Sequence, residues 1–330
     1  MREATRANGN VASVSAMGGL VTLGETMALF RGASIGSLSH EHAFELGIGG
    51  AESNVAIGVA RLGGSAAWMG RVGADGFGER VLRELRAEGL DLRATVDEGA
   101  RTGLMVKERR TAGLTRVLYY RAGSAGSRLA ASDLDEELIR SAGVLHVTGI
   151  TPALSDAAAG AVRAAVDLAV AAGVPVSFDV NHRASLWSAD AAVPVYRELA
   201  ARSTAVFAGE DEAAMLVGDG TPQELAERLA ALGPGQVVIK LGAEGCLALV
   251  DGATYAVPAV PVQPVDTVGA GDAFVAGYLA ELLDGRSVEQ RLATAVRTGA
   301  FACLGPGDWE SYARRDELAL LDAAGDPVAR

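Results

Sequence analysis

The chain has 330 residues, of which 49% are hydrophobic and 21% charged, and its formal net charge is −12. This composition supports a sizeable folded core and excludes a disordered chain. Because nucleic acids and anionic membranes bind clustered Lys or Arg, an acidic chain with no basic run is expected to bind neither.

At this length an α/β protein often forms one large core with a small appendage. We therefore expect a single domain over residues 19–330 with a small β lid. Residues 1–18 are polar and small and lack a secretion-signal pattern, so they are expected to form a disordered leader or an extension from an upstream start site. Cys246 and Cys303 belong to no CxxC or Cys/His cluster, which suggests neither a disulfide framework nor a zinc site. These features fit a cytoplasmic protein.

Short apolar runs alternate with longer amphipathic ones, which is typical of βαβ units and a mainly parallel sheet. Apolar runs that predict strands lie at residues 20–25, 144–150, 174–183, 203–212 and 236–245. Helical patterns lie at residues 53–63, where Ser53 is a possible cap, and at residues 273–283. Ligands of open parallel sheets bind at the carboxyl ends of the strands. Those ends carry the polar residues Asp179, Asn181, Arg183, Glu210, Glu212 and Lys240.

Between residues 102 and 121 the pattern changes to two extended segments joined by a turn that contains glycine. A hairpin inserted into an α/β chain predicts a lid, to which residues 25–47 are expected to contribute. Tyr119 and Arg121 are two residues apart on the second segment, so their side chains should lie on the same face. Pairing of lids between subunits would cover the exposed sheet edges, so we expect a homodimer or higher homo-oligomer.

The segment DTVGAGD, from Asp266 to Asp272, leads directly into the helical pattern AFVAGYLAELL. Gly269, Ala270 and Gly271 are small enough for their backbone N–H groups to converge, and the start of a helix adds partial positive charge there. Phosphate is the ligand that such a site suits best. Asp272 would be held ionised and could accept a proton from a substrate hydroxyl. The alternative is a tight turn that only begins a helix.

A second glycine-rich segment, IGGAESN, also precedes a helix. Gly49 and Gly50 would allow a polyhydroxylated ligand to approach the backbone, and Asn54 could offer both a donor and an acceptor to its hydroxyls. A turn followed by a helix cap is the alternative interpretation. The segment matches neither the GxxxxGK[ST] nor the GxGxxG nucleotide motif.

Taken together, GGAESNVAIGVARLGG, GRVGADGFG and DTVGAGDAFVAGY resemble the two signatures of the ribokinase-like (PfkB) sugar kinases. The resemblance covers about residues 20–322 and implies a three-layer α/β fold with a central, mainly parallel sheet. Within that family, VLYYRAGSAGSRL, HVTGITPALS and DVNHRASLW resemble the 2-keto-3-deoxygluconate kinases. That narrower resemblance implies phosphorylation of the 6-hydroxyl of a sugar acid.

The resemblance implies phosphoryl transfer that depends on ATP and Mg²⁺. Asp272 would be the general base, and the N–H groups of Gly269, Ala270 and Gly271 would stabilise the transferring phosphoryl group. The residues expected to bind the substrate are Gly49, Gly50, Asn54, Met105, Tyr119, Arg121, Ile150, Arg183 and Asp272. Those expected to bind the nucleotide are Glu210, Lys240, Gly242, Gly245, Gly269 and Gly271.

The chain departs from the family pattern at two positions. Gly209 stands at the first position of the family's NxxE element, so Glu212, at its last position, is expected to act on Mg²⁺ through water. Met105 stands where the family often has an aromatic residue.

Three interpretations of the function remain open. Arg121 and Arg183 can bind a carboxylate in bidentate fashion, which favours a sugar-acid kinase, although either could be an ordinary surface ion-pair residue. A fructokinase, ribokinase or other neutral-sugar kinase would not depend on these arginines. A non-catalytic sugar-binding protein would bind a sugar without releasing ADP.

Overall fold

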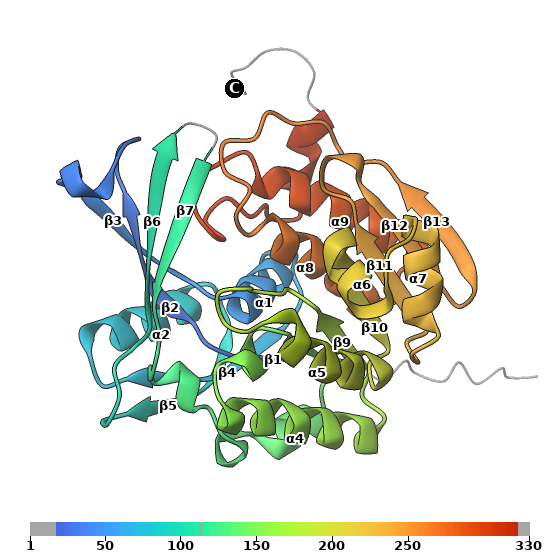
Figure 1. Cartoon of the computed structure of the whole chain (residues 1–330), viewed down its shortest axis with the longest axis horizontal. Coiled ribbons are helices and arrows are strands. Elements are labelled where there is room, and N and C mark those ends of the chain that lie inside the picture. Colours follow the sequence, from blue (N-terminus) through green and yellow to red (C-terminus); the bar gives the residue numbers. More distant parts are fainter. Residues whose placement is uncertain (1–17, 112–113, 323–330) are drawn as a thin grey trace, which may run out of the picture.

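The structure is a computed structural model that describes residues 18–111 and 114–322. These residues form a nine-stranded sheet between two groups of helices, and a separate four-stranded sheet projects from one corner (Figure 1). The expected three-layer α/β architecture is therefore confirmed. Apart from Gly18, the expected leader lies outside the described residues.

The large sheet is parallel from β5 to β11, and β12 and β13 extend it in antiparallel fashion. In spatial order its strands are β13 (Ala253–Val257), β12 (Cys246–Val250), β11 (Gln236–Lys240), β10 (Ala205–Gly209), β9 (Val176–Asp179), β8 (Val144–Thr148), β1 (Leu20–Leu23), β4 (Ala66–Gly73) and β5 (Asp91–Asp97). The parallel strands put their carboxyl ends at one edge of the sheet, where the polar residues were expected.

Helices cover both faces of the large sheet. One face packs against α1 (Ala51–Arg61), α2 (Gly76–Ala87), α8 (Ala270–Leu283) and α9 (Val288–Ala302). The other packs against α3 (Glu136–Arg140), α4 (Asp156–Ala172), α5 (Ala189–Ala201), α6 (Glu210–Val217) and α7 (Pro222–Ala230). Successive strand residues alternate between the two cores, so Val238 of β11 packs on the first face and Val237 and Ile239 on the second. None of the described helices is long and apolar enough to cross a membrane.

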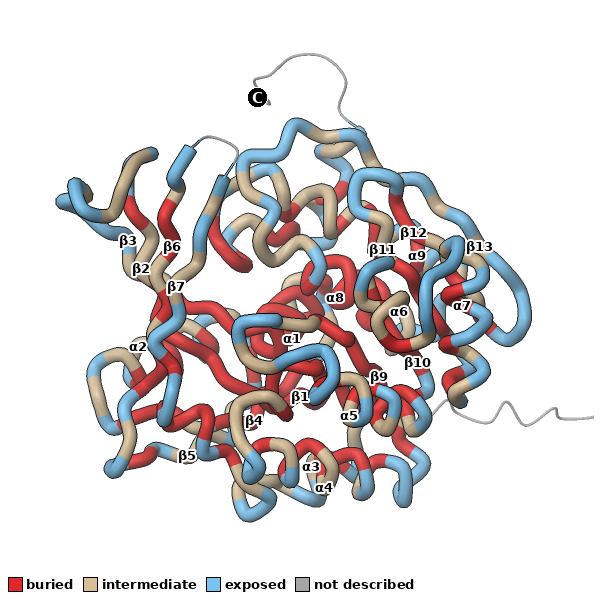
Figure 2. The backbone as a smooth tube through the Cα atoms, in the orientation of Figure 1, coloured by how far each residue is buried: buried red, intermediate tan, exposed pale blue. Residues whose placement is uncertain are grey.

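The small sheet consists of β3, β2, β6 and β7 in that order, and we use this name for it below. Its strands are β2 (Met27–Gly32), β3 (Phe44–Gly49), β6 (Leu104–Thr111) and β7 (Leu114–Tyr120). The expected hairpin is present as the antiparallel pair β6–β7, and its turn at residues 112–113 lies outside the described residues. Met27, Leu29 and Met105 pack together as a small apolar cluster. Figure 2 shows the tips of these strands exposed and the centre of the molecule buried.

Several expected boundaries are wrong by a few residues. Ser53 does not cap α1, because the helix begins at Ala51 and the Ser53 hydroxyl donates to the carbonyl oxygen of Gly50. Helix α8 begins at Ala270, three residues earlier than expected. Strand β10 ends at Gly209, so Glu210 and Glu212 lie in the first turn of α6 rather than at a strand end.

Candidate functional site

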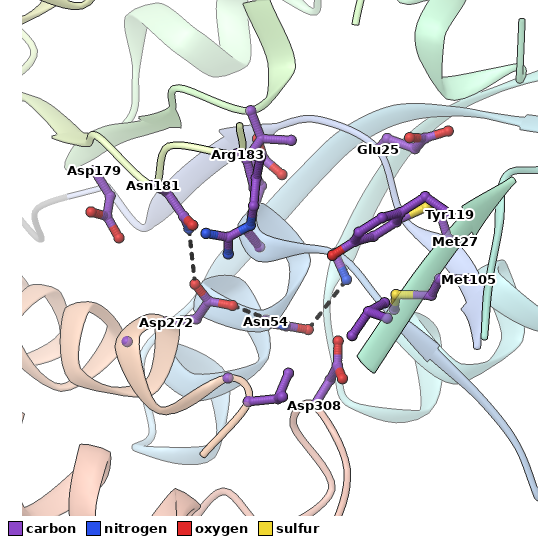
Figure 3. A pocket seen from close by; sticks show the side chains of 18 of the residues that line it. Glu25, Met27, Asn54, Met105, Tyr119, Asp179, Asn181, Arg183, Asp272 and Asp308 are labelled. Atoms are coloured by element: carbon purple, nitrogen blue, oxygen red, sulfur yellow. Dashed lines mark hydrogen bonds between the residues drawn. The ribbon is translucent and has the colours of Figure 1, made fainter. Parts of the chain in front are cut away.

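A cavity of about 370 Å³ lies where the inner side of the small sheet faces the carboxyl ends of the large sheet and the start of α8. We call it the polar cavity, because Asp179, Lys240 and Asp272 are among its charged lining residues. Figure 3 shows its side chains converging from α1, α8, the small sheet and the loop that follows β9. Segments from both ends of the chain therefore build one site.

Asp272 lies at the third position of α8 and is buried, with its carboxylate directed into the polar cavity (Figure 3). The amide of Asn54 donates to its Oδ2 at 2.9 Å, and that of Asn181 donates to its Oδ1 at 3.3 Å. Burial nevertheless raises the pKa of Asp272 to about 7, against the lowering effect of Asn54. The expectation that this site keeps Asp272 fully ionised is therefore wrong, and near neutral pH the group can either take up or release a proton.

The turn before α8 is held in a conformation that requires glycine. Gly269 has a φ of 79°, and a Cβ there would lie 1.9 Å from the carbonyl oxygen of Asp308. The N–H of Ala270 donates to the carbonyl oxygen of Thr267 at 3.3 Å. It is therefore not free to bind a phosphoryl group, contrary to expectation. Gly271 lies at the second helical position, where an N–H has no acceptor within the helix. It remains a donor for an anion.

A second cavity, of about 590 Å³, lies on the other side of this turn. We call it the apolar cavity, because Val260, Val262, Pro264 and Phe274 form much of its wall. The expected nucleotide residues Gly242 and Gly245 also line it, with φ values of 58° and 105°. Lys240, Thr267 and Gly271 line both cavities. The two cavities therefore meet at the N-terminus of α8.

Lys240 lies at this junction and is paired with a buried carboxylate. Its Nζ is 2.7 and 2.9 Å from the two carboxylate oxygens of Asp179. Burial acts to lower the pKa of Lys240, but the carboxylates of Asp179 and Glu212 outweigh it and raise that pKa. Lys240 is therefore a fixed positive charge beside both cavities.

The ligands available for Mg²⁺ are few. Within residues 18–111 and 114–322, no group of three His, Cys, Asp or Glu side chains could hold a metal ion. Glu212 lines the polar cavity, but its two oxygens accept the backbone N–H groups of Gly209 and His182 at 2.7 and 2.8 Å. The part of the chain that the structure describes thus provides no preformed metal cage, and metal binding by Glu212 stays a prediction.

The structure brings most of the expected substrate residues to one place. The expected residues that line the polar cavity are Gly50, Asn54, Met105, Tyr119, Arg121, Ile150, Arg183 and Asp272. Gly49 does not line it, because its backbone packs against Asp308 and Met105. Glu210 lines neither cavity, because it opens α6 instead of ending a strand.

The two arginines expected to bind a carboxylate have different surroundings. Arg121 follows the end of β7 and is buried, and its Nε donates to Glu25 at 2.7 Å. Its Nε and Nη2 are thus already paired with a buried carboxylate. Arg183 donates from Nη1 to the carbonyl oxygen of His182 at 3.3 Å, and its guanidinium extends into the polar cavity beside Asp272 (Figure 3). Arg183 is the arginine placed to meet an incoming anion.

The polar cavity also contains residues that were not among the expected site residues, and Asn181, Lys107 and Asp308 are three of them. Asn181 adopts a φ of 40°, which asparagine tolerates, and this turns its amide toward Asp272. Its place just after a strand was the one signal that the sequence offered. Lys107 and Asp308 pair with each other across the cavity wall although they are distant in the chain. No local motif marks that pair.

A profile of the pfkB family of carbohydrate kinases matches residues 17–313. A 2-dehydro-3-deoxygluconokinase of Bacillus subtilis (strain 168) is 38% identical over 92% of this chain and 95% of that protein. Fructokinase-1 of Oryza sativa subsp. japonica is 34% identical over 92% of this chain and 98% of that protein. The crystal structure of a 2-dehydro-3-deoxygluconokinase from Thermotoga maritima has a TM-score of 0.84 and 25% identity, and covers 92% of this chain and 97% of its own.

Proposed function

The chain belongs to the pfkB family of carbohydrate kinases and is a phosphotransferase with an alcohol group as acceptor, and on that premise we propose that it phosphorylates a sugar acid. The proposed substrate is 2-keto-3-deoxygluconate, also called 2-dehydro-3-deoxygluconate, and the proposed acceptor is its 6-hydroxyl. The observation that carries this proposal is the guanidinium of Arg183 inside the polar cavity. A guanidinium binds a carboxylate through two parallel hydrogen bonds.

In this proposal the nucleoside of ATP lies in the apolar cavity and the sugar acid in the polar cavity. The volume of the apolar cavity, about 590 Å³, is within the usual range for small-molecule pockets. The γ-phosphate then lies beside Gly271 and Lys240, at the junction of the two cavities. A helix N-terminus and a fixed ammonium both stabilise negative charge there.

Asp272 takes the proton of the acceptor hydroxyl as the phosphoryl group is transferred. Asn54 and Asn181 hold its two oxygens, so the carboxylate keeps one orientation while the substrate binds. A pKa of about 7 lets this carboxylate accept a proton near neutral pH.

Magnesium enters this proposal only with the nucleotide. A Mg²⁺ ion commonly keeps several of its waters and binds to substrate phosphates, so it can work with the sparse protein ligands described above. Its chemistry when bound is to neutralise charge on the phosphates.

A neutral sugar is the second candidate substrate. The pairing of Arg121 with Glu25 favours it, because this pairing leaves one arginine for a carboxylate where two were expected. The similarity to a fructokinase points the same way.

ADP release in the presence of ATP and Mg²⁺ separates the two candidates. The panel contains 2-keto-3-deoxygluconate, its C-4 epimer, fructose and ribose, each with the wild-type protein and Arg183→Met. We expect the keto acid to give the highest kcat/KM and Arg183→Met to lower it on the order of 10²-fold, since a charge-assisted hydrogen bond is lost. Arg183 also lowers the pKa of the neighbouring Asp272, so the same variant should lower kcat/KM for fructose as well, but by a smaller factor than for the keto acid.

Arg163→Met is the matched control, because Arg163 pairs with Glu198 on the outer helices. It should leave every kcat/KM unchanged. A neutral sugar that outperforms the keto acid would contradict the sugar-acid assignment. Binding of a sugar without any ADP release would favour a non-catalytic binding protein.

A further inference from the structure

Lys107 joins the small sheet to the body of the protein through a buried charge cluster. The residue lies on β6, and its side chain is 1% exposed. Its ammonium contacts the carboxylate of Asp308, lies 3.8 Å from Asp266 and donates to the carbonyl oxygen of Gly307 at 3.3 Å. One side chain of the small sheet thus meets two segments of the C-terminal half.

Both carboxylates belong to segments that shape the site. Asp308 lines the polar cavity, and Figure 3 shows its carboxylate directed toward the space between Asn54 and Met105. Asp266 begins the turn that precedes α8, where its Oδ1 accepts the N–H of Val268 at 3.1 Å. The position of the Lys107 ammonium therefore bears on the cavity wall and on the turn.

The loop that carries Asp308 is already fixed on its other sides. The indole of Trp309 donates to the carbonyl oxygen of Ile48 on β3 at 3.0 Å. The hydroxyl of Tyr312 donates to the carbonyl oxygen of Gly269 at 2.6 Å. Lys107 adds an attachment from β6, the strand that also carries Met105 to the polar cavity.

In this cluster a single ammonium group faces two carboxylates. Among the described residues, no cation other than Lys107 lies within ion-pair distance of Asp308 or Asp266. The side chains of Asp308 and Asp266 are each 7% exposed, and burial raises the pKa of Asp308. Without the ammonium the Asp308 carboxylate would have to take up a proton or move toward water. Either change alters the wall that a sugar meets.

We propose that Lys107 is a positioning residue for the sugar. Its ammonium holds the Asp308 carboxylate in the wall of the polar cavity and fastens β6 over that cavity. Lys107 lines the polar cavity and not the apolar one, so its loss affects sugar binding more than nucleotide binding. The proposal rests on the carbohydrate kinase activity and not on which sugar is phosphorylated.

The test measures KM for the sugar, KM for ATP and kcat, using whichever sugar the wild-type protein phosphorylates best. This choice keeps the test valid if the sugar-acid assignment fails. The variants are Lys107→Met, Lys107→Arg, Asp308→Asn and the double variant Lys107→Met/Asp308→Asn. We expect Lys107→Met to raise the sugar KM roughly 10- to 100-fold, because a buried charge loses its partner. The KM for ATP should change by less than about threefold.

Lys107→Arg keeps the positive charge and should restore most of the sugar affinity. Once Asp308 is neutral, replacing Lys107 should add little, so the double variant should have a sugar KM close to that of Asp308→Asn. This comparison still decides the question if Lys107→Met alone does not fold. An unchanged sugar KM in folded Lys107→Met would overturn the proposal. So would equal changes in the KM for the sugar and the KM for ATP, or a change in sugar KM of the double variant equal to the product of the two single changes.

Discussion

At the scale of single residues, Asp272 is subject to opposing effects. Burial disfavours its charged form, whereas the amide of Asn54 donates to the carboxylate and favours that form. The balance puts its pKa at about 7, far above the usual range of an aspartate. A surface carboxylate would be ionised at neutral pH but would be a weaker base. The environment of Asp272 thus suits proton transfer.

The pH dependence of kcat/KM for the sugar should follow this titration. Only ionised Asp272 can accept a proton, so we expect kcat/KM to fall as the pH drops through about 7 and to level off above it. Removing the Asn54 donor favours the protonated form, so Asn54→Ala should move the midpoint to higher pH. Steady-state kinetics over about two pH units on each side of neutrality measures both midpoints. A wild-type midpoint at the usual aspartate value would contradict the assignment.

At the scale of elements, the start of α8 is where most of the proposed chemistry takes place. Gly269 turns the chain so that Gly271 lies between the two cavities and Asp272 faces the polar one. This turn also packs against the loop that carries Asp308. Its shape is therefore fixed by contacts on both sides of the chain.

Alanine variants of two glycines at opposite ends of α8 distinguish the effect of backbone strain on stability from the effect of the turn on activity. Gly269→Ala meets both a φ of 79° and a backbone atom 1.9 Å from the new Cβ. It should destabilise the protein by about 1–3 kcal/mol and abolish most of the activity. Thermal unfolding and kcat measure the two effects.

Gly285→Ala is the control, because Gly285 has a φ of 68° but open space around a new Cβ. It should cost roughly 1 kcal/mol and leave kcat near the wild-type value. Equal activity in both alanine variants would mean that the turn before α8 is not required for catalysis.

The sequence predicted those parts of the site that depend on local order. Asp272 and Gly269 could be identified because a glycine-rich turn before a helix is a short-range pattern. The pairing of Arg121 with Glu25 could not, since these residues lie 96 positions apart and no periodicity connects them. The pairing of Lys107 with Asp308 could not be predicted for the same reason. Long-range ion pairs depend on how the small sheet packs against the body, which residue spacing does not encode.

At the scale of the whole molecule, two cavities share one wall. The large sheet supplies Lys240 to both cavities, α8 supplies Gly271, and the small sheet covers the polar cavity alone. Two ligands can therefore bind from different sides and meet at one helix N-terminus. Such an arrangement holds two reactants in contact.

The small sheet also bears on assembly, which stays a prediction. Strand β7 is an edge of this sheet and exposes Leu114 and Tyr120. Exposed edges of this kind are commonly covered by pairing with another chain. Light scattering should therefore give a mass of twice the 33.6 kDa chain or more. A mass equal to one chain would contradict the expected homodimer.

In the proposed reaction, Asp272 takes the proton from the sugar hydroxyl during phosphoryl transfer. The most direct test compares ADP release by the wild-type protein and Asp272→Asn, together with the affinity of each for the sugar measured by calorimetry. We expect kcat of the variant to fall by roughly 10²- to 10⁴-fold while the sugar still binds. An Asp272→Asn variant that binds the sugar and turns over at close to the wild-type rate would contradict it.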